Sequence, residues 1–512
     1  MAVKGEFVVR FVALNCTKGQ AVFGEVSLLR GAARKLVCAA ILLLSVWAWS
    51  VCAAPAPLVV THVTVIDATA HAPQLDQTVV IDNGRIVSIG PSARAKLPKG
   101  SHLVDAQGKF LIPGLWDMHV HLAGVNADPV WSKQVLLPLL LANGVTGVRD
   151  MGGDLDVLLA WKRDVESGAL LGPHLIAAGP WLAGSGRKTP EQYPVADAEE
   201  ARAAVRDLKR RGADFIKVIS LPSKEAFFAV ADESKKQNIT FAGHLPFEVS
   251  ALEASNAGMH SIEHLLYSAF SLSFSSREDD LRQRLIEAEQ KGDSVAWEQI
   301  AHESDTTYDT TKAAALFQAL KKNGTWVTPT LASLDTASHP QDWSVDDPLL
   351  EFVPPALSKQ WRDSFHDDAM KERAAWLARQ AANDWKLTGE LHHAGISLLV
   401  GSDSLDPFVF PGESLHKELA ELVRAGFTPG EALQAATRGA AQFLGRERDF
   451  GTVETGKLAD LVLLDASPLE NIANTQRVAA VIRGGKYLDR ADLDKLLAEA
   501  KVAAAATPVP AK

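Results

Sequence analysis

The chain has 512 residues, which is more than one small domain needs and enough for a large barrel with an accessory domain. Hydrophobic residues make up 47% of the chain and charged residues 22%, the balance of a globular protein, and this excludes a disordered chain. A net charge of −10 and the absence of a basic patch argue against nucleic acid as a partner.

Residues 1–53 are expected to form a leader that contains a signal peptide. Arg34 and Lys35 precede an uncharged apolar run, Leu36 to Ala54, that ends in small residues. This order is typical of a secretory signal, and it favours cleavage after Ala53. An uncleaved membrane anchor is the alternative, because the run is close to the roughly 20 residues that a membrane span needs.

The cysteines indicate the compartment. All three lie in the leader, at Cys16, Cys38 and Cys52. A mature chain without them has no disulfides, so its fold must be stabilised by other means, chiefly by its core. We therefore expect a periplasmic or secreted protein with no stable membrane anchor after cleavage.

Short alternating strands are expected near both ends of the chain. Between residues 57 and 111, two apolar alternations flank Asn83-Gly84, the strongest short signal for a hairpin. Between residues 446 and 490, Leu461–Asp465 and Val478–Arg483 have the same character. These two groups predict one small β-sandwich assembled from both ends of the chain.

Residues 112–445 alternate short apolar strands with helical stretches, which predicts a parallel (β/α)8 TIM barrel of the α/β class. Helices are expected at 198–211 and after the capping box Thr428–Glu431, among others. The eight strands are expected to end near His119, Asp150, Gly179, Ser220, His244, His264, Thr330 and Gly401.

Two excursions are longer than barrel loops need, at residues 268–325 and 331–391. Loops of this length are usually functional lids or oligomer contacts. Residues 491–512 are rich in Ala and Pro towards their end, and we expect them to form a tail that is disordered from Ala498.

Six potential metal ligands follow one another, each near the end of an expected barrel strand: His119, His121, Lys217, His244, His264 and Asp403. Catalytic groups of such barrels come from these strand ends. Side chains alternate along a strand, so a His-x-His pair points both imidazoles to one face. Imidazoles and a carboxylate suit zinc or a similar divalent ion. A buried lysine is a poor ligand unless it takes up CO2 and becomes a carbamate, an anion able to bridge two metals.

Other polar residues of the barrel are interpreted as structural. His260 is the rival of His264, but it begins the sixth strand, far from the C-terminal mouth, so we favour His264. Arg149 and Asp150 end the second strand, where an internal pair that supports the barrel is the favoured interpretation.

Six motifs carry a resemblance to a known family, and they stand at residues 111–121 (LIPGLWDMHVH), 143–150 (NGVTGVRD), 214–218 (DFIKV), 261–264 (SIEH), 401–403 (GSD) and 451–462 (GTVETGKLADLV). Through them the chain resembles the amidohydrolase superfamily, specifically its Xaa-Pro dipeptidase and imidazolonepropionase-like branch, from Val59 to Leu488. The first and last motifs are specific for the superfamily but are weak guides to the substrate.

The resemblance implies a binuclear centre with two divalent ions, with zinc expected and manganese or cobalt also suited. His119, His121 and Asp403 would hold the buried ion. His244 and His264 would hold the more exposed one, and a carboxylated Lys217 would bridge both. Imidazolonepropionases use one metal and lack this lysine, so Lys217 favours the two-metal, dipeptidase-like subset.

The same resemblance implies how the site works. Two dications lower the pKa of a bridging water towards neutrality, so that a metal-bridging hydroxide attacks the carbonyl. Asp403 would be the general base that returns the proton to the departing nitrogen. Tyr267 matches a tyrosine of relatives thought to polarise the substrate carbonyl.

We therefore expect a metal-dependent hydrolase that cleaves a C-terminal amide or peptide bond of a small substrate, as a dipeptidase or carboxypeptidase does. N-acyl amino acids and amide-linked toxins such as ochratoxin fit the same chemistry. A lactonase or other ester hydrolase is the alternative within the superfamily, and a non-catalytic metal-containing binding protein is the alternative of another class. Relatives often assemble into closed oligomers, so a homo-oligomer is also expected.

Overall fold

In the computed structural model the chain divides into two compact units, residues 1–56 and 57–512. The structure describes residues 8–15, 20–27, 56–69, 71–124, 127–184, 188–220, 223–265, 269–340, 346–366 and 368–507. The first unit contains an antiparallel hairpin of β1 (Val8–Asn15) and β2 (Gln20–Ser27). The apolar run expected in the signal peptide, residues 36–54, lies outside the described residues. Of the helices in the described ranges, none has the length and apolar character of a membrane span.

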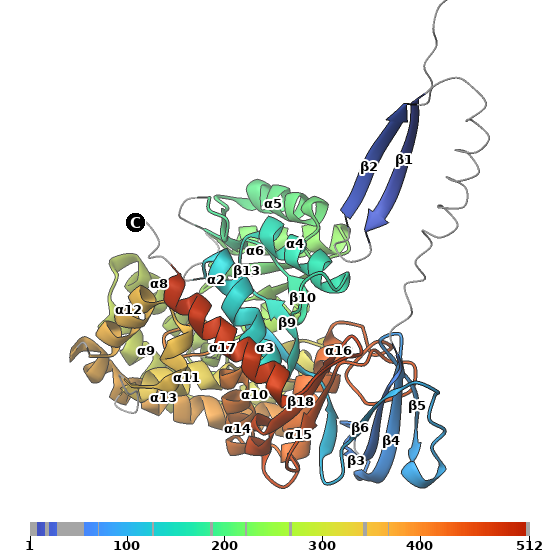
Figure 1. Ribbon diagram of the computed structural model, residues 1–512. Coiled ribbons are helices and arrows are strands. Elements are labelled where there is room, and N and C mark those ends of the chain that lie inside the picture. Colours follow the sequence, from blue (N-terminus) through green and yellow to red (C-terminus); the bar gives the residue numbers. More distant parts are fainter. Residues whose placement is uncertain are drawn as a thin grey trace, which may run out of the picture. The chain divides into compact units, whose positions relative to one another are not determined.

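In the second unit, both ends of the chain contribute to one eight-stranded sheet (Figure 1). Its order is β19-β18-β17-β7-β3-β4-β5, and β6 pairs with β3. The predicted hairpin is confirmed, because Asn83 and Gly84 adopt φ values of 48° and 75° between the paired residues Asp82 and Arg85. The strands are β3 (Leu58–Val65), β4 (Gln74–Asp82), β5 (Arg85–Pro91), β6 (His102–Asp105), β7 (Phe110–Pro113), β17 (Leu461–Leu464), β18 (Val478–Arg483) and β19 (Lys486–Leu488).

The middle of the chain forms two parallel sheets, with the orders β10-β9-β8 and β12-β11-β13-β14-β15-β16. Most residues of their strands are buried, as expected of parallel strands covered on both faces, and the edge strand β12 is only partly buried. They are β8 (Leu115–Val120), β9 (Val145–Asp150), β10 (His174–Ala177), β11 (Trp181–Ala183), β12 (Gln192–Pro194), β13 (Phe215–Ser220), β14 (Thr240–Gly243), β15 (Ser261–Glu263) and β16 (Trp326–Thr328).

Backbone hydrogen bonds join these two sheets at two places. On one side, the N–H of Asp214 donates to the carbonyl of Ala177, which links β10 to β13. On the other side, residues 398–404 lie between β16 and β8: Leu399 N–H donates to Val327, and Met118 N–H donates to Val400. This segment occupies the place expected of an eighth strand.

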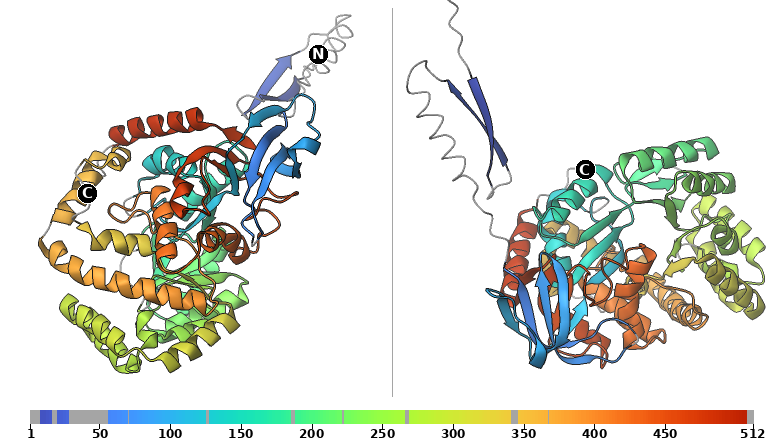
Figure 2. Two further views of the ribbon diagram at one scale, coloured as in Figure 1. Left: turned by 90° about the horizontal axis from the view of Figure 1, so that it is seen from below. Right: turned by 90° about the vertical axis from the view of Figure 1, so that its right-hand side faces the viewer.

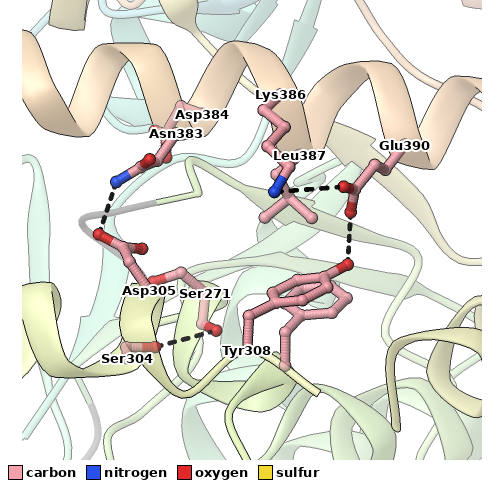
Figure 3. Close-up of a pocket in the computed structure, with 10 residues that line it drawn as sticks. Ser271, Ser304, Asp305, Tyr308, Asn383, Asp384, Lys386, Leu387 and Glu390 are labelled. Carbon is pink, nitrogen blue, oxygen red and sulfur yellow. Dashed lines mark hydrogen bonds and ion pairs between the residues drawn. The ribbon is translucent and has the colours of Figure 1, made fainter. Parts of the chain in front are cut away.

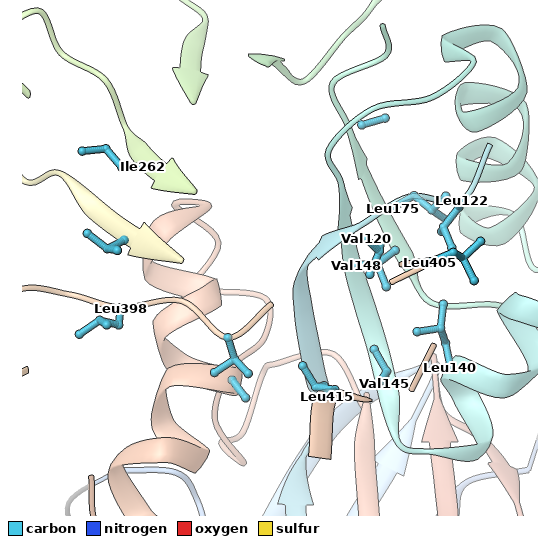
Figure 4. Packing of buried hydrophobic residues seen from close by; sticks show 14 of the residues in the cluster. Val120, Leu122, Leu140, Val145, Val148, Leu175, Ile262, Leu398, Leu405 and Leu415 are labelled. Atoms are coloured by element: carbon cyan, nitrogen blue, oxygen red, sulfur yellow. The ribbon is translucent and has the colours of Figure 1, made fainter. Parts of the chain in front are cut away.

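One large core lies between these strands and the helices that cover them. Figure 4 shows part of it, including Val120 of β8, Val148 of β9 and Leu140 of α3, all fully buried. The covering helices are α2 (Pro129–Trp131), η2 (Ser132–Leu136), α3 (Leu137–Ala142), α4 (Leu155–Glu166), α5 (Ala198–Arg211), α6 (Lys224–Lys236), α7 (Ala251–Asn256), α14 (Glu413–Arg424), α15 (Pro429–Gln434), η6 (Ala435–Gly439) and α16 (Ala440–Phe443). The predicted helix at 198–211 and the capping box of α15 are both confirmed.

The two long excursions are largely helical and pack on each other. Figure 2 shows their yellow and orange helices gathered on one side of the unit, away from the blue strands. The helices are η3 (Ser271–Phe274), α8 (Glu278–Lys291), α9 (Ser294–Thr306), α10 (Thr310–Asn323), α11 (Leu331–Ser338), η5 (Pro348–Phe352), α12 (Pro355–His366) and α13 (Asp368–His393).

Polar side chains join the first excursion to α13 around a small cavity of about 60 Å³ (Figure 3). Tyr308 donates to Glu390, and Asn383 donates to Asp305 at 2.5 Å. Beside this cavity, Trp376 and Leu377 of α13 share an apolar cluster with residues of α9 and α11. The two excursions therefore form one layer.

The expectation of a tail over residues 491–512 is wrong for most of that segment. Residues 490–506 form α17 (Arg490–Ala506), which begins at a capping box of Asp489 and Asp492. Leu493, Ala500 and Ala504 are buried on one face, and α17 lies beside α3 (Figure 1). Alanine is the best helix former, so the Ala-rich composition that suggested disorder instead supports a helix.

Candidate metal centre

All six candidate ligands line one cavity of about 300 Å³ at the C-terminal ends of the parallel strands. His119 lies in β8 and Lys217 in β13, while His121, His244 and His264 follow the ends of β8, β14 and β15. Asp403 lies in the segment that links β16 to β8.

His119, His121 and Asp403 form the tightest group, with one potential ligand atom of each within 4.8 Å of the others. Asp403 Oδ1 lies 3.3 Å from His119 Nε2 and 3.6 Å from His121 Nε2. The alternation of β8 explains the pair of imidazoles, as the sequence predicted. This is the donor set of a divalent-ion site.

Of the remaining three candidates, His264 approaches the second carboxylate oxygen of Asp403. Asp403 Oδ2 is 3.7 Å from His264 Nδ1, and the rings of His264 and His244 meet edge to face at 4.8 Å between centroids. Lys217 is 1% exposed, and its Nζ has no hydrogen-bond partner within the described ranges. Carboxylate, imidazoles and amine thus share one wall of the cavity.

Two glycines allow the strands to approach closely at this point. Gly243 precedes His244, and a Cβ there would lie 1.9 Å from the carbonyl oxygen of Val218. A Cβ on Gly401 would lie 2.7 Å from the Cβ of His119. Each glycine is therefore required for the spacing between the candidate ligands.

The backbone of the site is unusual as well. His264 and Asp403 have φ values of 63° and 57°, in the left-handed region that non-glycine residues rarely adopt. Such conformations cost free energy and cluster at functional sites.

A buried ion pair orients His119 from behind. Glu263 Oε2 accepts from His119 Nδ1 at 3.0 Å, which leaves Nε2 to face the cavity. Arg149 donates to both oxygens of Glu263 at 2.9 Å. A carboxylate behind a histidine is the usual partner of a metal-ligating imidazole.

This arrangement corrects the predicted pair of Arg149 and Asp150. Asp150 instead accepts the backbone N–H groups of Leu122 and Gly152. Sequence reasoning missed Glu263; the only signal was its place in the motif SIEH, directly before His264.

Asp117 connects the motif at residues 111–121 to the motif at residues 401–403, a second contact that the sequence did not reveal. It is fully buried, and its oxygens accept from Ser402 Oγ at 2.6 Å and from Ser402 N–H at 3.0 Å. Burial raises the pKa of Asp117 to about 7, although these hydrogen bonds oppose the shift. The contact fixes Asp403 relative to His119.

The N-terminus of α11 holds His264. Thr330 precedes α11, and its hydroxyl lies 2.7 Å from His264 Nδ1, so it does not cap the helix. Glu418 of α14 takes that place, since its carboxylate accepts the N–H of Ala332 at 2.7 Å.

Burial favours the neutral, metal-binding form of two of the candidate imidazoles. Burial holds the pKa of His119 and of His244 well below the ordinary histidine value. Burial also lowers the pKa of Lys217 to about 8, although Glu263 and Asp403 oppose it. For Asp403, burial acts to raise the pKa, but the neighbouring histidines outweigh burial and lower it below its usual range. Neutral imidazoles beside an ionised carboxylate are the forms that bind metal ions.

The residues present fit a divalent cation. His119 Nε2 and Lys217 Nζ are both buried without a described hydrogen-bond partner, and such an orphan atom costs about 1–3 kcal/mol. Metal coordination would satisfy the imidazole directly, and a carboxylated lysine would add an anionic oxygen ligand.

Two other residues were considered for the site from the sequence, Tyr267 and His260. Tyr267 lies outside the described residues. His260, the rival of His264, stacks on Phe443 at 4.1 Å and is not among the residues that line the cavity.

Known proteins share this architecture. Ochratoxinase of Aspergillus niger is 24% identical over 478 residues, which cover 81% of this chain and 83% of that protein. The structure of a Xaa-Pro dipeptidase with methionine bound in its active site matches with a TM-score of 0.62 and 20% identity, covering 85% of this chain and 100% of that one. Bottromycin amidohydrolase matches with a TM-score of 0.62 and 24% identity, covering 87% and 90%.

These likenesses show a shared fold, which in this superfamily is a TIM barrel with an additional domain. The sequence profile of the amidohydrolase family matches residues 110–488. That range holds all six candidate ligands and most of the chain, and the protein therefore belongs to the amidohydrolase family.

Proposed function

We propose that the protein hydrolyses a C-terminal amide or peptide bond of a small substrate, such as a dipeptide or an N-acyl amino acid. As a member of the amidohydrolase family it is a hydrolase of carbon–nitrogen bonds. The observation that carries the proposal is the position of Asp403, whose carboxylate lies within 3.7 Å of nitrogens of His119, His121 and His264 at one cavity.

The proposed cofactor is a pair of divalent ions, preferably zinc. His119, His121 and Asp403 would hold one ion, His244 and His264 the other, and an N-carboxylated Lys217 would bridge them. Bound divalent ions lower the pKa of water and polarise a carbonyl group, which is the chemistry that amide hydrolysis needs.

The residues of the chain supply the remaining steps. Asp403 would accept a proton from the attacking water and return it to the departing nitrogen, because an amine leaves poorly without a proton. Glu263 keeps His119 Nε2 directed at the cavity. Trp181, Ile219 and Leu405 give the cavity apolar walls that limit water. Tyr267 is proposed to polarise the substrate carbonyl.

The finer architecture belongs to the same proposal: a closed (β/α)8 barrel over residues 112–445, with a β-sandwich from 57–111 and 446–490.

Export to the periplasm or the medium is proposed from the leader. N-terminal sequencing of natively exported protein is expected to begin at Ala54 or a close neighbour, and a start before Leu36 would contradict cleavage.

The test is a screen of the zinc-loaded protein against Xaa-Pro and Xaa-Arg dipeptides, N-acyl-Phe amides and lactones. We expect turnover of at least one amide class, and a loss of about 10²–10⁴-fold in kcat for Asp403→Asn at unchanged ligand affinity. Turnover of lactones alone would favour the ester hydrolase. Ligand binding without turnover in both proteins would favour the binding protein.

A further inference from the structure

Part of the cavity wall is formed by residues other than the six candidate ligands. Trp181, Ile219, Leu405 and Asp406 complete its described lining. Asp406 is the only charged residue among these four, and no described arginine lines the cavity. The charge on this part of the described cavity lining therefore comes from the carboxylate of Asp406, which lies beside three apolar side chains.

The position of Asp406 is fixed on both sides. Its N–H donates to the carbonyl of Asp403 at 3.2 Å, and its carbonyl accepts from Val409 N–H at 2.9 Å. Its Oδ2 accepts from Ser333 Oγ at 2.8 Å, and Ser333 is buried on α11. The side chain is thus held by the layer of the two excursions and remains exposed at the cavity.

Within the described ranges no lysine, arginine or histidine lies within ion-pair distance of the Asp406 carboxylate, and His121 is the cationic group whose charge acts on it. The charge nearest along the turn is the carboxylate of Asp403, of the same sign. A carboxylate among apolar groups gains free energy when a cation approaches it.

Trp181 adds a second feature suited to a cation. Its ring packs over Gly152, where a Cβ would lie 2.2 Å from the indole, and it meets His121 edge to face at 6.1 Å. A tryptophan face attracts guanidinium and ammonium groups. A fixed carboxylate and a fixed indole thus line the same cavity.

We propose that Asp406 is a specificity-determining residue that selects substrates with a positively charged side chain, guanidinium or ammonium, on a residue beside the scissile amide. The inference rests on the proposed function, since it places this charge beside the bond that Asp403 acts on. The substrate class that follows is a dipeptide or acyl amino acid of a basic residue.

The first experiment measures binding without turnover. L-arginine and L-citrulline have nearly the same shape and the same charged α-ammonium and α-carboxylate groups, but only the side chain of arginine is charged. Calorimetry on the zinc-loaded protein is expected to show arginine binding about fivefold or more tightly, as one charge pair contributes. Equal affinities for the two would overturn the proposal, whether or not the protein hydrolyses any amide.

The second experiment uses variants and the dipeptides Ala-Arg and Ala-citrulline. Asp406→Asn is expected to bring the two kcat/KM values within about twofold of each other, while Asp406→Glu retains the preference for arginine. Asp494→Asn removes an exposed carboxylate of α17 and is the matched control for net charge. A preference unchanged in Asp406→Asn would overturn the proposal. If neither dipeptide nor any other amide is hydrolysed, the proposed function fails, and the arginine-to-citrulline binding ratio still decides the role of Asp406.

Discussion

Lys217 brings a long amine into the cavity, and burial lowers its pKa to about 8. A substantial fraction of the amine is then neutral near pH 8, and the neutral amine is the form that reacts with CO2. Lys217→Ala is therefore expected to lose the paired metal site and most activity, while the parallel strands still fold. Metal analysis after dialysis is expected to fall from two ions per chain to one or none, and millimolar acetate or propionate to restore part of the activity.

Lys217→Arg distinguishes a carbamate from a simple positive charge. A guanidinium remains protonated and cannot become a carbamate, so this variant is expected to stay inactive. Lys224→Ala, which removes a partly exposed lysine of α6, is the control and should bind two ions. An arginine variant with near wild-type turnover and two bound ions would exclude a bridging role for Lys217.

His416 gives a prediction about pH. It is 1% exposed, and burial lowers its pKa from 6.5 to about 4. The unfolded chain therefore binds a proton between these pH values when the folded chain does not. The stability present above pH 6.5 is lost as the pH falls towards 4, by about 3 kcal/mol for this residue.

His416→Leu removes this titration. The variant also loses the contact of His416 Nδ1 with Thr475 Oγ1 at 2.9 Å, so it is expected to be about 1 kcal/mol less stable at pH 7.5. Urea unfolding at several pH values is expected to show this difference shrink, or change sign, by pH 4.5. Wild-type and variant stabilities that fall in parallel would show that His416 does not titrate as inferred.

The candidate ligands were predictable because their signals are local. His119 and His121 are two residues apart at the end of one strand, His244 and Asp403 each follow an apolar stretch, and His264 ends the motif SIEH. The residues that orient them were not predictable. Glu263 contacts His119 across 144 residues, and Asp117 contacts Ser402 across 285, distances at which one sequence gives no pairing information.

At the scale of elements, the N-terminus of α11 links the metal centre to α14. Thr330 uses its hydroxyl on His264, so Glu418 caps the helix instead. Burial raises the pKa of Glu418 to about 8, and the acid form that dominates at pH 7 resembles a glutamine. Glu418→Gln is therefore expected to behave like the wild type.

Glu418→Leu is expected to lose the cap and to destabilise the protein by about 1–2 kcal/mol. Because Thr330 then holds His264 less firmly, metal affinity should fall by about tenfold, as for other groups that orient a ligand. Zinc titration with a competing chelator measures the affinity, and urea unfolding measures the stability. Lower stability with unchanged zinc affinity would show that Glu418 is only a helix cap.

Elements with strong local signals were predicted well, and those that depend on tertiary packing were not. The helix at 198–211 combines an N-cap aspartate with an apolar face, and both signals lie in the segment itself. α17 has few apolar residues apart from alanine, so its buried face is apparent only where it lies against α3. The last parallel segment, 398–404, forms single bridges to β8 and β16 and no regular strand.

At the scale of the whole molecule, the six candidate ligands connect segments from residue 119 to residue 403. An ion held by His119, His121 and Asp403 would join β8 to the segment after β16, and a second ion would extend the connection to β14 and β15. Ions that bind only the folded chain stabilise it, by about 4 kcal/mol per site at a thousandfold excess over Kd. No cysteine follows Cys52, so no disulfide can link the segments that hold the candidate ligands, and metal ions are the cross-links that these segments could share.

We therefore expect a chelator to lower the melting temperature of the protein by several degrees, because it also leaves His119 Nε2 and Lys217 Nζ buried with no hydrogen-bond partner among the described residues. Zinc should restore the melting temperature, whereas magnesium should not, since imidazole ligands prefer zinc. A double variant, His119→Ala with His121→Ala, is the control, and the chelator should change its melting temperature much less. Calorimetry in which chelated and zinc-loaded wild type unfold at the same temperature would contradict a metal centre that connects these strands.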